Sequence, residues 1–140
     1  MSTIDTNKAV ARRYIEAFWN GDDPSIIAEI AVEAVIGHPA SGQTLQGRDL
    51  LEQRHTALRQ VYGDIRFVVE DLIAEGDKVL LRWSFTGKQI GPIMGAEPTG
   101  KQVSVGGMNL FQLTGGKIVE FWVNADDLGE LQQLGLAPAP

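Results

Sequence analysis

The sequence predicts an α+β fold, with helices packed on one face of a strongly bent, mostly antiparallel sheet. Up to residue 62, apolar residues recur at helical spacing in three segments. From residue 65 onward they alternate with a period of two, in segments joined by glycine-containing turns. Clustered helices followed by hairpin-linked strands are typical of α+β proteins.

The three predicted helices have recognisable starts and ends. The first covers residues 5–20 and ends at the Asn20-Gly21-Asp22 turn. Asp23-Pro24 then supplies an N-cap and a first-turn proline for a short second helix over residues 25–30. The third helix covers residues 48–62 and carries an apolar stripe along one face.

Strands follow wherever the apolar period changes to two. We expect them over residues 32–36, 65–74, 78–86 and 101–114. Within the last of these, Gly106-Gly107 indicates a bulge or a close approach of another segment. The Gly115-Gly116 turn leads into a final aromatic strand that ends in Asp126 and Asp127, before a short helix over residues 127–134. A bent sheet crossed by three helices forms a cone, whose open end is a natural pocket for an apolar small molecule.

Length, charge and composition narrow the functional classes. The chain has 140 residues, which predicts one domain over 1–140, and it has no cysteine. Its net charge is −6 and its twelve basic residues are scattered, which argues against a nucleic acid or an anionic membrane as partner. A neutral or poorly charged small molecule, or another protein, fits better. No signal peptide or membrane span is recognisable, so we expect a cytoplasmic protein.

The sequence motifs argue against a phosphate-binding loop and against a metal site. The Gly95–Lys101 segment matches the spacing of a phosphate-binding loop, but Gln102 replaces the required Ser or Thr and a strand pattern follows in place of a helix. The two histidines have no metal-binding spacing, so no metal is expected.

Several short motifs follow one another in a characteristic order along nearly the whole chain. They are Ala17-Phe18-Trp19-Asn20, Gly37-His38-Pro39, the 74–79 hairpin, Pro98-Thr99-Gly100-Lys101, the 116–122 strand, Asp126 and the 131–135 segment. In this order the sequence resembles the SnoaL-like polyketide (ester) cyclase family of the nuclear-transport-factor-2-like (NTF2-like) superfamily. The resemblance implies an NTF2-like cone, a homodimer, catalysis without cofactor, and an apolar substrate that carries carbonyl groups.

The resemblance also implies roles for particular residues. Asp126, four residues after Trp122, would be the general acid/base of an intramolecular aldol or Michael-type ring closure, a lyase- or isomerase-type reaction. His38 would be a second catalytic group that holds a substrate carbonyl. The implied substrate-binding residues are Trp19, His55, Trp83, Gln89, Met108, Leu110, Gln112, Trp122 and Asn124. Gln112 and Gln89 depart from the histidine or arginine that relatives carry there, which leaves the substrate open.

The residues themselves leave several alternatives open. Counting by twos places Ile118, Glu120, Trp122, Asn124 and Asp126 on one face, if no bulge intervenes. An apolar cone would raise the pKa of Asp126, whereas Asp127, adjacent to the helical run, would be the helix cap. His38 could equally be a partly exposed loop histidine, and His55 a core-edge histidine bonded to the backbone or to water. The alternative functions are an epoxide hydrolase-like enzyme, in which Arg82 could pair with a carboxylate, and a non-catalytic binding module.

Overall fold

The structure is a computed structural model that describes residues 3–140. Its helices are α1 (Thr3–Arg13), the π-helix η1 (Tyr14–Trp19), the 3-10 helix η2 (Pro24–Ile26), α2 (Ile27–Ile30), α3 (Arg48–Val61) and α4 (Asp127–Gln133). Its strands are β1 (Ala31–Pro39), β2 (Leu45–Gln46), β3 (Tyr62–Glu75), β4 (Lys78–Gln89), β5 (Gln102–Thr114) and β6 (Lys117–Ala125). None of these helices has the length and apolarity that a membrane span requires.

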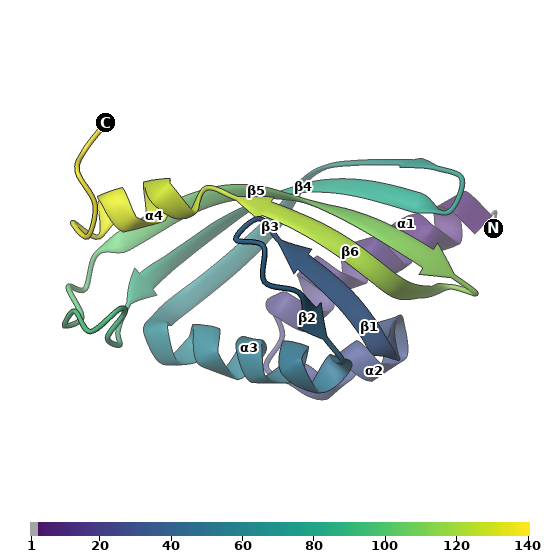
Figure 1. The fold of residues 1–140 in the computed structure, drawn as a ribbon, viewed down its shortest axis with the longest axis horizontal. Helices are drawn as coiled ribbons and strands as arrows, with labels where there is room; N and C mark the ends of the chain where they lie inside the picture. The colour runs from purple at the N-terminus through teal and green to yellow at the C-terminus, as the bar shows by residue number, and fades with distance from the viewer. Residues whose placement is uncertain (1–2) are drawn as a thin grey trace.

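The strands form one six-stranded sheet with the order β2-β1-β6-β5-β4-β3. All neighbouring pairs are antiparallel except β1 and β6, which are parallel. The sheet is bent, and α1, α2 and α3 lie on its concave side, while α4 continues beyond the end of β6 (Figure 1). The predicted α+β cone with three helical segments before the long strands is therefore confirmed.

The core lies between the helices and the concave face of the sheet. Tyr14 packs edge-to-face on Phe111, with ring centroids 5.1 Å apart, and also contacts Phe121 at 5.6 Å. Gly37 in β1 makes room for Phe121, because a Cβ at that position would lie 2.4 Å from the ring. Each such buried aromatic side chain contributes about 1.5–3 kcal/mol through removal of apolar surface from water.

The first helix is not one continuous α-helix as predicted. It changes to a π-helix over Tyr14–Trp19, where the amide of Asn20 bonds the carbonyl of Ile15 at 3.2 Å. Residues five apart lie far apart around an α-helix of about 3.6 residues per turn, but the wider π-turn brings them closer to one face. Tyr14 and Trp19 consequently both reach the concave side of the sheet.

A bulge in β6 reverses the predicted facing of this strand. Gln112 of β5 pairs with Glu120 and Leu113 pairs with Ile118, so Val119 is the extra residue. Beyond the bulge, Phe121 and Val123 point to the concave side. The prediction that Ile118 shares a face with Glu120, Trp122, Asn124 and Asp126 is therefore wrong.

The double glycine of β5 marks a close approach, one of its two predicted roles. The register with β4 is continuous through Gly106 and Gly107. A Cβ on Gly107 would lie 2.3 Å from the Trp83 indole, whereas one on Gly106 would meet nothing within 4 Å. Gly107 therefore provides the space in which Trp83 lies against the sheet.

Candidate active site

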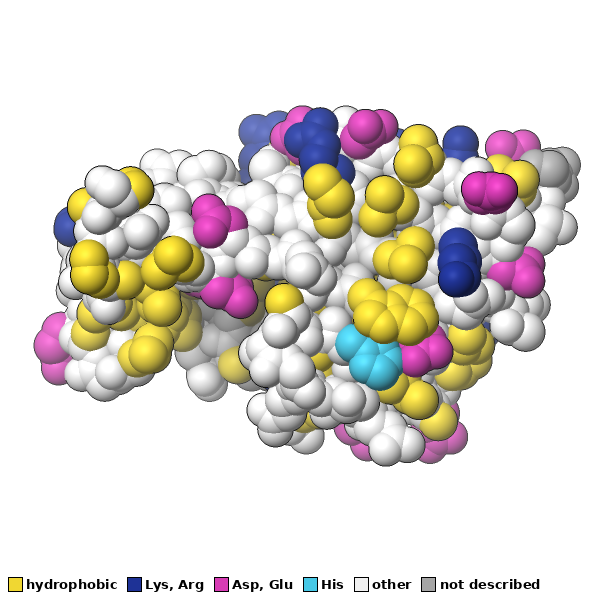
Figure 2. All heavy atoms as spheres, turned by 45° about the horizontal axis from the view of Figure 1, so that its top comes forward, with side chains coloured by type: hydrophobic (Ala, Val, Ile, Leu, Met, Phe, Trp, Pro, Cys, Tyr) yellow, Lys and Arg dark blue, Asp and Glu magenta, His cyan; other side chains and the backbone are white. Residues whose placement is uncertain are grey.

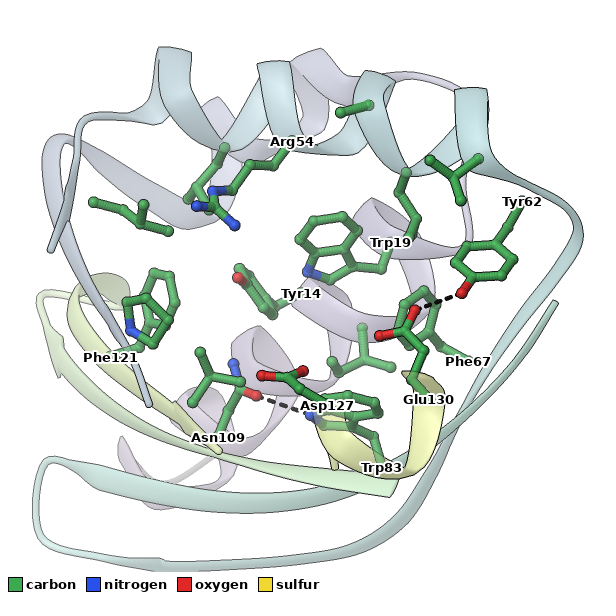
Figure 3. Close-up of a pocket in the computed structure, with 18 of the residues that line it drawn as sticks. Tyr14, Trp19, Arg54, Tyr62, Phe67, Trp83, Asn109, Phe121, Asp127 and Glu130 are labelled. Carbon is green, nitrogen blue, oxygen red and sulfur yellow. Dashed lines mark hydrogen bonds between the residues drawn. The ribbon is translucent and has the colours of Figure 1, made fainter. Parts of the chain in front are cut away.

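A cavity of about 440 Å³ opens between the helices and the concave face of the sheet (Figure 3). This volume lies within the range of small-molecule sites. Most of its wall is apolar and aromatic, and it comes from Tyr14, Ile15, Trp19, Pro39, Leu45, Leu51, Ala57, Leu58, Val61, Tyr62, Phe67, Trp83, Ile93, Phe121 and Val123. The polar or charged side chains in the lining, besides the tyrosines and tryptophans, are Arg54, Asn109, Asp127 and Glu130.

The polar groups lie on opposite walls of the cavity. Figure 3 shows the Arg54 guanidinium entering from α3 and the Tyr14 hydroxyl directed toward it. On the other wall, the side chains of Asp127 and Asn109 enter the cavity. The site therefore combines an apolar body with a cationic end and an acidic end.

The two adjacent aspartates exchange the positions that the sequence predicts for them. Asp126 is the N-cap of α4, and its carboxylate accepts a hydrogen bond of 2.9 Å from the amide of Gly129. Gly129 accommodates this contact because a Cβ there would lie 2.1 Å from Asp126 Oδ2. Asp127, the first residue of the helix, lines the cavity. The predicted enclosure of Asp126 in apolar walls is wrong, since its side chain is exposed.

The third carboxylate of this segment, Glu130, forms a hydrogen bond that joins two elements of the fold. Glu130 accepts a hydrogen bond of 2.5 Å from the Tyr62 hydroxyl, which joins α4 to the start of β3 (Figure 3). Burial raises the pKa of Tyr62, and the bond to Glu130 raises it further. The phenol therefore stays protonated and acts as the donor near neutral pH.

Asn109 has one side of its amide fixed by Trp83. Both residues are buried, and the Trp83 indole N–H donates to Asn109 Oδ1 at 2.8 Å. Because an indole nitrogen can only donate, this bond assigns the oxygen of the amide. The Asn109 NH₂ group then faces the cavity as a donor (Figure 3).

Of the predicted substrate-binding residues, Trp19 and Trp83 line the cavity. Five others lie on the convex face of the sheet, because the residues next to them in β5 and β6 are the ones that face the concave side. These five are Met108, Leu110, Gln112, Trp122 and Asn124. Their placement in the pocket is therefore wrong. Arg82 is also exposed, since the flanking Leu81 and Trp83 face the core.

His38 lies on the convex face as well, outside the cavity. Its ring stacks on Trp122 with centroids 5.2 Å apart, and its Nε2 is 2.6 Å from a carboxylate oxygen of Glu120. Figure 2 shows a histidine (cyan) beside hydrophobic side chains on this face. The predicted contact between His38 and the substrate carbonyl is therefore not possible in this arrangement.

His55 and Gln89 are buried, and their side chains form hydrogen bonds within the protein. His55 Nε2–H donates to the carbonyl of Gly21 at 2.8 Å, and no partner for its Nδ1 occurs within residues 3–140. The interpretation of His55 as a core histidine is confirmed, and its assignment to substrate binding is wrong. Gln89 bonds the carbonyl of Gly91 at 3.1 Å and the hydroxyl of Thr99 at 2.7 Å, which ties the β4–β5 connection together.

Sequence reasoning missed five polar residues of the cavity: Tyr14, Arg54, Tyr62, Asp127 and Glu130. One signal was available, because Asp127 and Glu130 are three residues apart and share a helix face. Leu51, Arg54 and Leu58 likewise follow one face of α3. As for metals, residues 3–140 bring no three His, Cys, Asp or Glu side chains together in a suitable group.

Comparisons with known proteins agree with this architecture. The family model for SnoaL-like polyketide cyclases matches residues 9–134. A candidate SnoaL-like polyketide cyclase from Jannaschia sp. has a similar structure, with a TM-score of 0.87, 26% identity, and coverage of 99% of this chain and 98% of that one. IdmH, a candidate polyketide cyclase from Streptomyces antibioticus, gives a TM-score of 0.80, 25% identity, and coverage of 92% and 98%. A candidate polyketide cyclase from Bacillus cereus gives 0.80, 29% identity, and coverage of 94% and 81%. No curated protein matches the sequence.

Proposed function

The chain belongs to the SnoaL-like polyketide cyclase family, and from that premise we propose that it catalyses proton transfer at a carbon next to a carbonyl group, with Asp127 as the general acid/base. The ring closure of a substrate with several carbonyl groups would follow from this step. The proposal retains the reaction expected from the sequence and moves it to the neighbouring carboxylate.

The observation that carries the proposal is the state of the three carboxylates near the cavity. Asp126 accepts from the amide of Gly129, and Glu130 accepts from the Tyr62 hydroxyl. The Asp127 side chain has no hydrogen bond or ion pair within residues 3–140, although it lines the cavity. It is therefore the carboxylate whose oxygens are free to accept a proton from a bound molecule.

A donor on the cavity wall suits the other half of the reaction. When Asp127 removes the proton, the C–H bond breaks and its electron pair moves to the carbonyl oxygen, giving an enolate. The Asn109 NH₂ group, on the same wall as Asp127, is positioned as a candidate donor to such an oxygen (Figure 3).

The second step closes the ring without any further reagent. The enolate carbon forms a bond with a second carbonyl carbon of the same molecule, and the carbonyl π bond opens to an alkoxide. The protonated Asp127 then returns the proton to that oxygen. Substrate and product have the same atoms and the same oxidation level, so the balance requires no oxidant, reductant or second substrate.

The test follows exchange of the acetyl protons of a neutral bicyclic ketone, the methyl ester of acetylnaphthoic acid, for deuterium by NMR. We expect Asp127→Asn to lower the protein-catalysed exchange rate about a hundredfold or more, the usual contribution of a general base. Asp126→Asn is the matched control, because asparagine also caps helices well and the exchange rate should stay within about twofold.

Three outcomes separate the candidate functions. Loss of exchange with Asp127→Asn alone supports the proposal. Loss with Asp126→Asn alone would return the catalytic role to Asp126. Binding of the ketone without exchange above the protein-free rate would favour a non-catalytic binding module.

A further inference from the structure

Arg54 is a cation in a wall that is otherwise apolar. Leu51, Leu58 and Val61 line the cavity from the same face of α3. Arg54 occupies the intervening position, and its guanidinium enters the cavity (Figure 3). A residue on this face would be expected to be apolar if it served only to close the wall.

The guanidinium of Arg54 forms no hydrogen bond or ion pair with the part of the chain that the structure describes. Other arginines of the chain bond carboxylates or backbone carbonyls: Arg12, Arg13, Arg48 and Arg59. Arg54 has no hydrogen bond or ion pair within residues 3–140, even though Asp127 and Glu130 line the same cavity. Its five N–H donors are therefore available to a bound molecule.

Tyr14 converges on the same part of the cavity. Its side chain is 3% exposed and its hydroxyl points toward Arg54 (Figure 3). Burial raises the pKa of Tyr14, while the Trp19 indole and the Arg54 guanidinium act in the opposite direction, so the positive charge reaches the phenol. A guanidinium fork beside a neutral hydroxyl is a suitable donor set for a carboxylate.

We propose that the substrate of this site carries an anionic group, a carboxylate, which binds Arg54 and Tyr14 and thereby directs its ketone toward Asp127. The inference rests on the proposed function for the role of Asp127. It specifies the substrate class as an aromatic or otherwise apolar keto acid, in contrast to the neutral or poorly charged molecule that the composition favours.

The opposite wall determines the orientation of such a molecule. Asp127 and Glu130 would repel a carboxylate placed on the α4 side. The cationic wall attracts it to the α3 side, and the apolar middle of the cavity accommodates the ring system. The proton to be removed then lies at the end that faces Asp127.

The experiment compares acetylnaphthoate with its neutral methyl ester, with binding measured by calorimetry and exchange measured by NMR. We expect the wild-type protein to bind the acid at least about tenfold more tightly than the ester, as for a hydrogen bond to a charged group. Arg54→Leu should remove this preference by weakening binding of the acid, with less than about a twofold effect on the ester. Arg54→Gln, which keeps a polar side chain, should behave like Arg54→Leu.

Arg66→Leu is the matched control. Arg66 is also exposed and has no partner within residues 3–140, but it lies on β3 next to the cavity-lining Phe67 and points away from the cavity. This variant should keep the preference for the acid. A preference that disappears in both arginine variants would indicate an effect of net charge and would overturn the inference.

Failure of the inference is distinguishable from failure of the proposed function. Equal binding of acid and ester by the wild-type protein, or equal weakening of both by Arg54→Leu, would overturn the anionic subsite. Slower deuterium exchange of the ester in Arg54→Leu would also overturn the anionic subsite. It would place Arg54 at the reacting oxygen and not at a carboxylate. If the acid binds through Arg54 but Asp127→Asn exchanges at the wild-type rate, the subsite stands and the proposed catalysis fails.

Discussion

Asp126 and Asp127 have the same chemistry and adjacent places in the chain, yet their surroundings give them different tasks. The Asp126 carboxylate accepts a hydrogen bond from the amide of Gly129, which is one of the otherwise unpaired donors at the start of a helix. The Asp127 carboxylate faces the cavity. Stability and catalysis should therefore respond to different members of the pair.

Asp126→Ala should lower the free energy of unfolding by about 1 kcal/mol, the usual value of a lost N-cap. Asp126→Asn should cost far less, because its side-chain oxygen can accept the same bond. Asp127→Ala should stay within about 0.5 kcal/mol, as for a surface position without a partner. Urea unfolding measures all three, and a larger loss for Asp127→Ala than for Asp126→Ala would contradict the assignment of the cap.

Because Tyr14 is buried, we expect the folded protein to lose stability at alkaline pH. Its pKa in the folded protein is raised by burial above the ordinary value of about 10. A group with a raised pKa contributes stability that is fully present below its unfolded pKa and is lost as the pH rises above it. Unfolding curves recorded at increasing pH above about 10 should show this loss, and Tyr14→Phe should make it shallower. An unchanged slope in Tyr14→Phe would exclude Tyr14 as the source.

At the level of elements, the position of β5 against β4 shapes the cavity wall. Gly107 allows the Trp83 indole to lie flat enough for its N–H to reach Asn109. At the far end of the strand, the side chain of Gln133 in α4 bonds the amide and the carbonyl of Ser104, both at 2.8 Å. The strand thus fixes both the floor of the cavity and the helix at its opening.

Gly107→Ala should destabilise the protein by about 1–3 kcal/mol, since the new methyl group must displace the Trp83 indole. Gly106→Ala is the matched control and should be close to neutral, because its Cβ would meet nothing within 4 Å. Urea unfolding and tryptophan fluorescence of both variants test the prediction. A neutral Gly107→Ala would show that the indole has room to move.

At the level of the whole molecule, one row of apolar side chains crosses the convex face of the sheet. The register places Ile73 opposite Leu80, Leu80 opposite Leu110, Leu110 opposite Trp122, and Trp122 beside His38. Ile73 is 59% exposed and Trp122 is 36% exposed, and hydrophobic side chains gather on this face in Figure 2. We propose that a second copy of the chain packs on this row, because contiguous exposed apolar surface marks association sites.

Trp122→Glu should convert the proposed dimer to a monomer, because it introduces a charge into the row at its largest side chain. Leu128→Glu is the control, since Leu128 is 59% exposed on α4, outside the row. Light scattering coupled to gel filtration gives the mass of each variant. A monomeric wild-type protein, or a dimer that persists in Trp122→Glu, would contradict this use of the face.

The predictable part of the candidate site was its apolar frame. Trp19 and Trp83 are large aromatic side chains on elements that the periodicity identifies, and they line the cavity. Most of the polar part was not predictable, since it lies on η1, α3 and α4, and only the tertiary structure decides which side of each helix faces the cavity. Trp122 was placed in the pocket by the resemblance and by counting alternate residues, and His38 by the resemblance, but both lie on the convex face.

The sequence by itself determined the order and kind of the elements, because helical and strand periodicity, proline and glycine turns and apolar burial act over a few neighbouring residues. Only the tertiary structure decided which carboxylate faces the cavity. The extra residue Val119 arises from the pairing of β6 with β5, and it reverses the facing of every following side chain in the strand. The wide turn over Tyr14–Trp19 likewise brings two distant aromatic residues to one wall.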